Sequence, residues 1–192
     1  MIGMTTLRVV FPDQLDRSIL TAIADNGERV LVAETGPPFT GRTHRRKLVL
    51  VAAAGRHYAR DLRAAGVKLE HRTLADRSHE RPLREHIVAV AHQCGAGEVV
   101  ALRPGSWSQL AELEAAARDL GVALRVEEDP HFLTTPGEFD EHAAGRKRLV
   151  MEYFYREVRR RYDILMDGAA PATGAAPATG AWNYDAENRE AF

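Results

Sequence analysis

The chain has 192 residues, of which 45% are hydrophobic and 28% charged, and its formal net charge is −1. This composition suits a globular domain with an appendage, and the near-zero charge gives no long-range attraction to nucleic acid or to a membrane surface. Cys94 is the only cysteine, which excludes an intrachain disulfide and any all-cysteine metal or iron–sulfur site within this chain. No apolar run reaches the roughly 20 residues that span a bilayer, and the N-terminus does not resemble a signal peptide, so we expect a cytoplasmic protein.

Up to residue 126 the chain alternates between strand and helix patterns. Residues 7–11 form a short apolar run that stops at Pro12, which is typical of a strand. A helix follows, which Asp16 can cap and which Asn26-Gly27 ends. The later strands are predicted at 29–33, 67–72, 98–102 and 122–126, and the later helices at 43–65, 80–94 and 107–120.

The segment 43–65 is open to two interpretations. Residues 47–54 have the composition of a buried strand. Apolar side chains nevertheless recur at intervals of three and four residues across the whole segment, and Gly66 stands where a helix C-cap glycine would. Gly55 in the middle costs a helix about 1 kcal/mol relative to alanine, which the burial of two or three apolar side chains outweighs. We therefore predict one long helix.

Strands that alternate with helices predict a parallel sheet covered on both faces, which is a doubly wound, Rossmann-like α/β fold. We expect a five-stranded sheet with the order 3-2-1-4-5, numbered along the chain. Residues 1–130 would form this domain, and residues 131–192 a helical and extended appendage. The appendage would contain a helix at 146–163 and a low-complexity segment at 169–181, in which Ala-Ala-Pro-Ala-Thr-Gly occurs twice.

Polar side chains follow the first two predicted strands, where an open parallel sheet binds its ligands. Asp13, Gln14 and Glu34 could hydrogen-bond the edge of a flat heterocycle, with Trp107 as a stacking surface. The simpler interpretation, which spacing alone favours, is that Asp13 and Gln14 form a turn and that Glu34 pairs with a nearby arginine. The first loop has no Gly-x-Gly-x-x-Gly, so a dinucleotide site of the usual kind is not expected.

Patterns of catalytic and metal-binding residues are weak. The eight histidines include no His-x-x-x-His and no cluster with cysteine, so His44 and His57 are better explained as surface or core groups. Ser106 has no glycine elbow around it and is a better helix cap than a nucleophile. We therefore predict no catalytic residue and no metal site.

The last part of the chain is basic and aromatic. Residues 146–161 carry seven Arg or Lys against two Glu, with three consecutive aromatic residues among them. This run could track phosphates or line an acidic face of a second domain, but such an aromatic cluster is rarely left exposed in a monomer. We predict a partner interface made of Tyr153, Phe154, Tyr155, Arg156, Trp182, Tyr184 and Arg189.

Several motifs together resemble those of one family. They include Asp-Gln-Leu at 13–15, Arg-His-Tyr-Ala-Arg-Asp-Leu at 56–62, Pro-Gly and Trp within 104–107, and Trp-Asn-Tyr-Asp-Ala-Glu-Asn-Arg at 182–189. Further matches are Glu34, Phe132-Leu133, Glu138-Phe139, Ala144 to Lys147 and Met151 to Glu157. The set is similar to the N-terminal antenna domain and interdomain segment of prokaryotic photolyase-related proteins, the iron–sulfur bacterial cryptochromes and (6-4) photolyases.

The resemblance implies a chromophore site. Full-length members repair (6-4) photoproducts or sense light, their N-terminal domain binds 6,7-dimethyl-8-ribityllumazine, and their C-terminal helical domain carries FAD and a four-cysteine 4Fe–4S cluster. FAD and the 4Fe–4S cluster are not expected in this chain, which would not repair DNA alone. It would bind a lumazine or a flavin through Asp13, Gln14, Glu34, Lys47, Arg56, Arg103 and Trp107.

The chain departs from the family pattern at the strand ends. Pro12 stands before Asp-Gln-Leu where the family usually has glycine, and Arg103, Ser106 and Ser108 replace two acids and an arginine around Trp107. The interdomain motifs stay closer to the pattern. We interpret this as retained packing or partner contact together with an altered ligand.

Two functions of different classes therefore remain open. The first is an antenna-type domain that acts only with a catalytic partner, such as a separate FAD-bearing helical domain. The second is a non-catalytic interaction module that docks another protein, or a second copy, through its aromatic and basic C-terminal segment. Nucleic-acid binding by this chain alone through residues 146–161 is not favoured, and it would depend steeply on salt.

Overall fold

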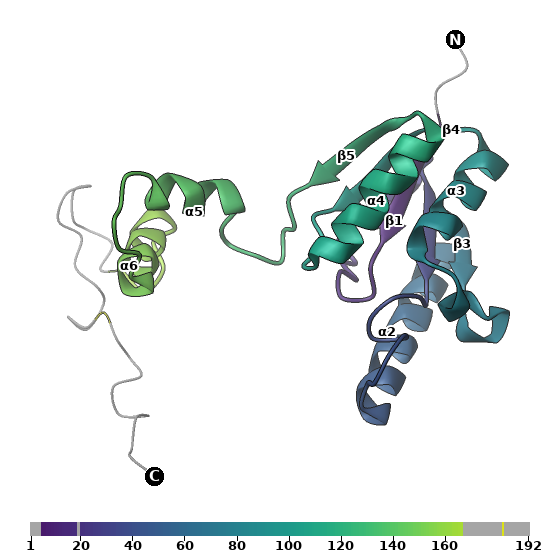
Figure 1. Ribbon diagram of the computed structural model, residues 1–192, viewed down its shortest axis with the longest axis horizontal. Helices are drawn as coiled ribbons and strands as arrows, with labels where there is room; N and C mark the ends of the chain where they lie inside the picture. Colours follow the sequence, from purple (N-terminus) through teal and green to yellow (C-terminus); the bar gives the residue numbers. More distant parts are fainter. Residues whose placement is uncertain (1–4, 19, 167–181, 183–192) are drawn as a thin grey trace. The chain divides into compact units, whose positions relative to one another are not determined.

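The structure is a computed structural model that describes residues 5–18, 20–166 and 182. The chain divides into two compact units, Met1–His131 and Phe132–Phe192. Among the described residues, all strands belong to the first unit, and the second unit contains two helices (Figure 1). Among the described residues, the sheet therefore lies entirely within the first unit.

The sheet of the first unit consists of parallel strands. In chain order they are β1 (Thr5–Val10), β2 (Arg29–Ala33), β3 (Lys68–Arg72), β4 (Ala96–Leu102) and β5 (Ala123–Glu127). They are arranged as β3-β2-β1-β4-β5, and every neighbouring pair is parallel. The predicted α/β fold and strand order are confirmed.

Helices cover both faces of this sheet (Figure 1). On one face lie α1 (Leu20–Asp25) and α2 (Arg45–Ala64), and on the other lie α3 (Leu83–Cys94) and α4 (Trp107–Leu120). Two short 3₁₀ turns, η1 (Leu74–Asp76) and η2 (Ser78–Glu80), lead from β3 into α3. The long helix predicted across residues 47–54 is confirmed by α2, and the strand interpretation of that segment is wrong.

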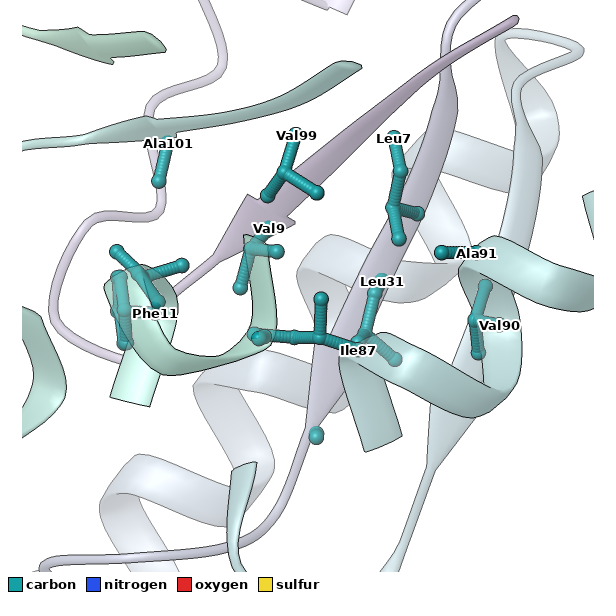
Figure 2. Packing of buried hydrophobic residues seen from close by; sticks show 12 residues of the cluster. Leu7, Val9, Phe11, Leu31, Ile87, Val90, Ala91, Val99 and Ala101 are labelled. Atoms are coloured by element: carbon teal, nitrogen blue, oxygen red, sulfur yellow. The ribbon is translucent and has the colours of Figure 1, made fainter. Parts of the chain in front are cut away.

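Alternate residues of the strands point to opposite faces, and each face buries its own hydrophobic cluster. The cluster against α3 and α4 contains Leu7 and Val9 of β1 packed with Ile87 of α3 (Figure 2). The cluster against α1 and α2 contains Val30 of β2 packed with Tyr58 of α2. Because both faces of the central strands are buried, their sequences are continuous apolar runs. These runs made it possible to predict the strands from the sequence.

Arg8 is a charged exception within β1. Its side chain is 9% exposed, and it pairs with Glu28 at 2.5 Å and with Glu127 of β5 at 2.7 Å. Burial lowers the pKa of Arg8, but hydrogen bonds and charge interactions with these two carboxylates outweigh burial and raise it above its usual value. A buried guanidinium is tolerated when it is paired in this way, so Arg8 ties the start of β2 to β5.

In the second unit, α5 (Pro136–Ala143) and α6 (Met151–Arg161) form a helical pair. The ring of Phe139 packs edge-on against Phe154, with 5.2 Å between the ring centroids. The buried His142 bonds to Glu157 at 2.7 Å. Glu138 accepts hydrogen bonds from Arg161 at 2.6 Å and from the Tyr162 hydroxyl at 2.8 Å. A small aromatic core and a rim of polar bonds therefore hold the two helices together.

Some predicted helix boundaries are wrong. The helix predicted at 146–163 begins only at Met151, because Gly145 turns the chain with φ +71° and residues 146–150 are not helical. The helix predicted at 80–94 begins at Leu83, because η2 occupies residues 78–80. Helix α5 was not predicted at all, although Thr135 and Glu138 form a capping box at its start. The low-complexity segment at 169–181 lies outside the described residues.

The two predicted caps differ from the expected geometry. Asp16 accepts a hydrogen bond from the Ser18 amide at 2.7 Å, two residues before α1 begins to form at Leu20. Ser106 occupies the N-cap position of α4, but its side chain makes no cap hydrogen bond. Its hydroxyl lies 2.8 Å from that of Ser108 instead. The start of α4 is therefore as predicted, whereas α1 begins four residues after its predicted cap at Asp16.

Glu138 predicts an acid-dependent stability for the helical pair. Hydrogen bonds from the Thr135 amide, Arg161 and Tyr162 lower the pKa of Glu138 from 4.5 to about 2. Since the pKa is lower in the folded state, the stabilisation is present above about pH 4.5 and is lost as the pH falls toward about 2. We expect Glu138→Gln to lower the melting temperature at neutral pH, and the difference from the unmodified chain to vanish near pH 2 in thermal scans. A difference that stays constant over this range would contradict the assignment.

Candidate functional site

A crevice opens at the carboxyl ends of the strands of the first unit. Between β1 and β4 the chain's connections change direction, which makes this edge the topological switch point of the sheet. Two adjoining cavities occupy it, and both are lined by Pro12, Pro37 and Gln109. The fold therefore places a divided cavity at the position where open α/β sheets bind ligands.

The first cavity, which we call the apolar chamber, has a volume of about 290 Å³. Two of its polar wall residues are engaged in bonds of their own: the Thr35 hydroxyl donates to the Arg81 carbonyl at 2.6 Å, and Glu112 accepts from the Arg84 amide at 2.9 Å. The buried Nδ1 of His79, in the same wall, has no hydrogen-bond partner among the described residues. The apolar wall is formed by Val10, Phe11, Ala33, Pro37, Pro82 and Leu83. Such a wall suits a flat hydrophobic ring better than a charged group.

The second cavity, the polar chamber, has a volume of about 340 Å³. It lies between the first turn of α2 and the first turn of α4, since it is lined from α2 by Lys47 and from α4 by Gln109. Its other polar wall residues are Asp13, Thr43 and Ser106. This chamber therefore offers a cation, a carboxylate, hydroxyls and an amide to a ligand.

Glu34 determines how the walls of the crevice are held together. Its side chain is 3% exposed and accepts two hydrogen bonds from Arg56 of α2, at 2.7 and 2.9 Å, and one from the Leu74 amide of η1 at 2.7 Å. Its carbonyl accepts a hydrogen bond from the Ser78 hydroxyl at 2.8 Å. Burial works to raise the pKa of Glu34, but the bonds from Arg56 and Leu74 outweigh it and hold the pKa below the usual value. The carboxylate is thus already satisfied by the protein.

Gln14 joins the loops that follow three of the strands. Its backbone amide closes a turn on the Phe11 carbonyl at 3.0 Å. Its side-chain amide donates to the Arg103 carbonyl at 2.8 Å and to Asp129 at 3.0 Å, while the Arg103 guanidinium pairs with Glu128 at 2.8 Å. The buried Gln14 Oε1 has no hydrogen-bond partner among the described residues. Gln14 and Arg103 therefore act within the protein, and a direct contact with a ligand stays a prediction.

The structure brings only some of the predicted contact residues to the chambers. Asp13 and Lys47 line the polar chamber. Trp107 is 88% exposed at the start of α4, beside two serines that line the chambers. The pairing of Glu34 with an arginine, the simpler interpretation, is observed. Among the described residues, neither chamber is lined by Gln14, Glu34, Arg56 or Arg103.

Several wall residues were not found from the sequence. Thr43 and Pro37 belong to the loop that follows β2, so the rule that strand ends face the ligand could have indicated them. Residues 79–83 run from η2 to the first residue of α3 and do not follow a strand end directly, and no sequence signal marks them. Their place in the wall depends on hydrogen bonds that Glu34 accepts from Leu74 and Ser78 and that Thr35 donates to Arg81, which hold this segment against the end of β2.

The predicted partner-interface residues lie in different environments. Tyr153 is 57% exposed and Tyr155 is also exposed, whereas Phe154 is 9% exposed because it packs against Phe139. Phe154 therefore belongs to the core of the α5–α6 pair. Tyr184 and Arg189 lie outside the described residues.

Trp182 is contacted from within the chain. The guanidinium carbons of Arg156, Arg159 and Arg160 lie 5.3, 5.3 and 4.6 Å from the centroid of its ring. Arg159 is buried and also donates to the Trp182 carbonyl at 3.1 Å, and Arg156 pairs with Glu152 at 2.9 Å. Cation–π contacts therefore hold Trp182 on α6, and its role toward a partner stays a prediction.

The described part of the chain holds neither a candidate metal site nor a candidate membrane span. No group of three or more His, Cys, Asp or Glu residues is placed there to hold a metal ion. In the same part, no helix has the length and apolar character needed to cross a membrane.

The bonds around Glu34 predict a large effect of a small substitution. Glu34→Gln removes the charge that Arg56 and the Leu74 amide bind, and we expect it to lower the free energy of unfolding by about 2 kcal/mol. Glu114→Gln is the matched control, because Glu114 is exposed and lies 3.9 Å from Arg118; it should change the value by less than about 0.5 kcal/mol. Urea unfolding followed by circular dichroism measures both, and equal effects would contradict the role given to Glu34.

Comparison with known proteins gives the family. The sequence model described as deoxyribodipyrimidine photo-lyase-related protein matches residues 8–192. A (6-4) photolyase of Agrobacterium fabrum is 31% identical over 191 residues, which is 97% of this chain and 36% of that protein. This chain thus spans about a third of the length of that relative. Among solved structures, the universal stress protein from Archaeoglobus fulgidus matches 64% of this chain and 93% of its own, with a TM-score of 0.40 and 17% identity. The chain belongs to the family of deoxyribodipyrimidine photo-lyase-related proteins.

Proposed function

We propose that the chain is an antenna-type domain of a photolyase-related protein and that it holds a planar chromophore in the strand-end crevice. The observation that carries this proposal is the apolar chamber at the switch point of the sheet, joined to a chamber of polar groups. Each chamber is near the lower end of the ~300–1,000 Å³ range of small-molecule sites, and together they fall within it. The candidate chromophores are 6,7-dimethyl-8-ribityllumazine and a flavin.

The walls provide the contacts that such a chromophore needs. The ring would pack on Phe11 and Leu83 in the apolar chamber, and a polyhydroxyl chain would reach Asp13 and Gln109 at the polar side. Trp107 stands at the rim with its ring exposed to solvent. An exposed indole costs hydration free energy that a stacked ligand or a covering partner would recover.

A domain of this kind needs a partner to use absorbed light. This chain spans 36% of the (6-4) photolyase it resembles, so the repair activity belongs to that whole protein. We propose that the chain transfers excitation energy to a separate helical domain that carries FAD, in the cytoplasm, and that it has no repair activity alone.

A second function, an interaction module, is favoured by one observation. Of the eleven large hydrophobic residues that are exposed in the described part of the chain, eight lie between Phe132 and Leu165 in the second unit. An apolar surface of this kind marks an interface.

The part of the Agrobacterium relative that this chain does not span is the partner to test. Tyr153→Ser should weaken its binding in light scattering, whereas Val49→Ser on α2 should not, and a chain that neither binds it nor self-associates would contradict this function.

The crevice is tested by ligand titration of the purified chain. We expect both 6,7-dimethyl-8-ribityllumazine and riboflavin to bind, as measured by fluorescence anisotropy. Ser108→Phe places a ring in the mouth of the apolar chamber and should weaken binding at least ~10-fold, which corresponds to about 1.4 kcal/mol.

The control is Ser18→Phe, the same substitution at an exposed serine before α1, which lines neither chamber. It should leave the affinity within about twofold. If neither compound binds, or if both variants weaken binding equally, the crevice is not the chromophore site.

A further inference from the structure

The first turn of α2 carries three consecutive basic residues, Arg45, Arg46 and Lys47, and no acidic one. This arrangement opposes the helix dipole, whose positive end is at the N-terminus; each cation there costs about 0.3–1 kcal/mol. Arg42 precedes them in the loop. Among residues that the structure describes, no carboxylate forms a salt bridge with any of these four side chains. Basic side chains at a helix N-terminus that are not paired with carboxylates destabilise the helix. Such an uncompensated cost points to a function for these side chains.

The unpaired charge lies beside the polar chamber. Thr43, in the loop before α2, and Lys47 and Val51 of α2 form its wall on this side. On the opposite side stands Ser106, the N-cap residue of α4, whose hydroxyl pairs with Ser108 and does not cap the helix amides. The chamber is thus bounded by the positive ends of a 20-residue and a 14-residue helix and by one ammonium group, against a single carboxylate from Asp13.

We propose that the polar chamber binds a phosphate group, and that the crevice takes a phosphorylated flavin of the flavin mononucleotide class in preference to an unphosphorylated ligand. The inference rests on the proposed function for the ring, which occupies the apolar chamber. Both chambers share Pro12, Pro37 and Gln109 in their walls, so one molecule can place its ring in one and its phosphate in the other.

Each wall group has a distinct part in holding the phosphate. The Lys47 ammonium pairs with it, and the Thr43 and Ser106 hydroxyls donate hydrogen bonds to its oxygens. Arg45 and Arg46 are exposed in the same turn and raise the positive potential around it. Asp13 accepts hydrogen bonds from the hydroxyls of the ribityl chain, which keeps its carboxylate away from the phosphate.

The test compares ligands that differ only in the phosphate. We expect the purified chain to bind flavin mononucleotide at least ~10-fold more tightly than riboflavin, as measured by flavin fluorescence. Lys47→Ala should remove most of this difference by weakening the binding of flavin mononucleotide. Lys68→Ala is the matched control, because Lys68 is an exposed lysine at the start of β3 and lines neither chamber. Inorganic phosphate should compete with flavin mononucleotide and not with riboflavin.

The outcomes separate this inference from the function on which it rests. If riboflavin binds as tightly as flavin mononucleotide, the phosphate site is wrong while the chromophore site stands. If neither flavin binds, both are wrong. If an oligonucleotide displaces flavin mononucleotide and its binding is lost in Lys47→Ala, the basic turn serves nucleic acid, which also overturns the inference.

Discussion

The buried carboxylate of Glu34 is the interaction on which the crevice depends. A carboxylate taken out of water is stable only if the protein replaces the lost hydration, and here Arg56 and the Leu74 amide do so with three hydrogen bonds. The donors come from α2 and η1, which are distant in sequence from β2. The same two segments lead into the walls of the polar and the apolar chamber. One buried carboxylate therefore bonds the end of β2 to the two segments that continue into the chamber walls.

The two chambers have opposite chemistry because different parts of the fold supply their walls. The apolar chamber continues the hydrophobic interior, since Val10 and Phe11 at the end of β1 belong to the buried clusters. The polar chamber lies beyond that interior, between the starts of α2 and α4. Its positive potential is local, in a chain whose formal net charge is only −1. The near-zero net charge thus conceals a local concentration of basic residues in the first turn of α2.

The sequence predicted the sheet well because the central strands are buried on both faces and are therefore continuously apolar. It predicted α2 because its apolar side chains recur with helical spacing, in spite of Gly55. The sequence did not predict α5, because this helix has only eight residues and a mostly polar surface. Its capping box was the one signal of its start. Tertiary contacts decided the rest. The sequence marked Phe154 as an aromatic anchor but not that its partner is Phe139, and it suggested an arginine for Glu34 but not that Arg56 supplies it.

The central claim is that the strand-end crevice is a two-chambered ligand site. The most direct measurement is a titration of the isotope-labelled chain with flavin mononucleotide, followed by backbone amide chemical shifts. The account predicts shifts at Thr43, Lys47 and Ser106 of the polar chamber and at Thr35 and Leu83 of the apolar chamber, with α5 and α6 unchanged. Shifts confined to α5 and α6, or shifts spread evenly over exposed basic residues, would contradict it.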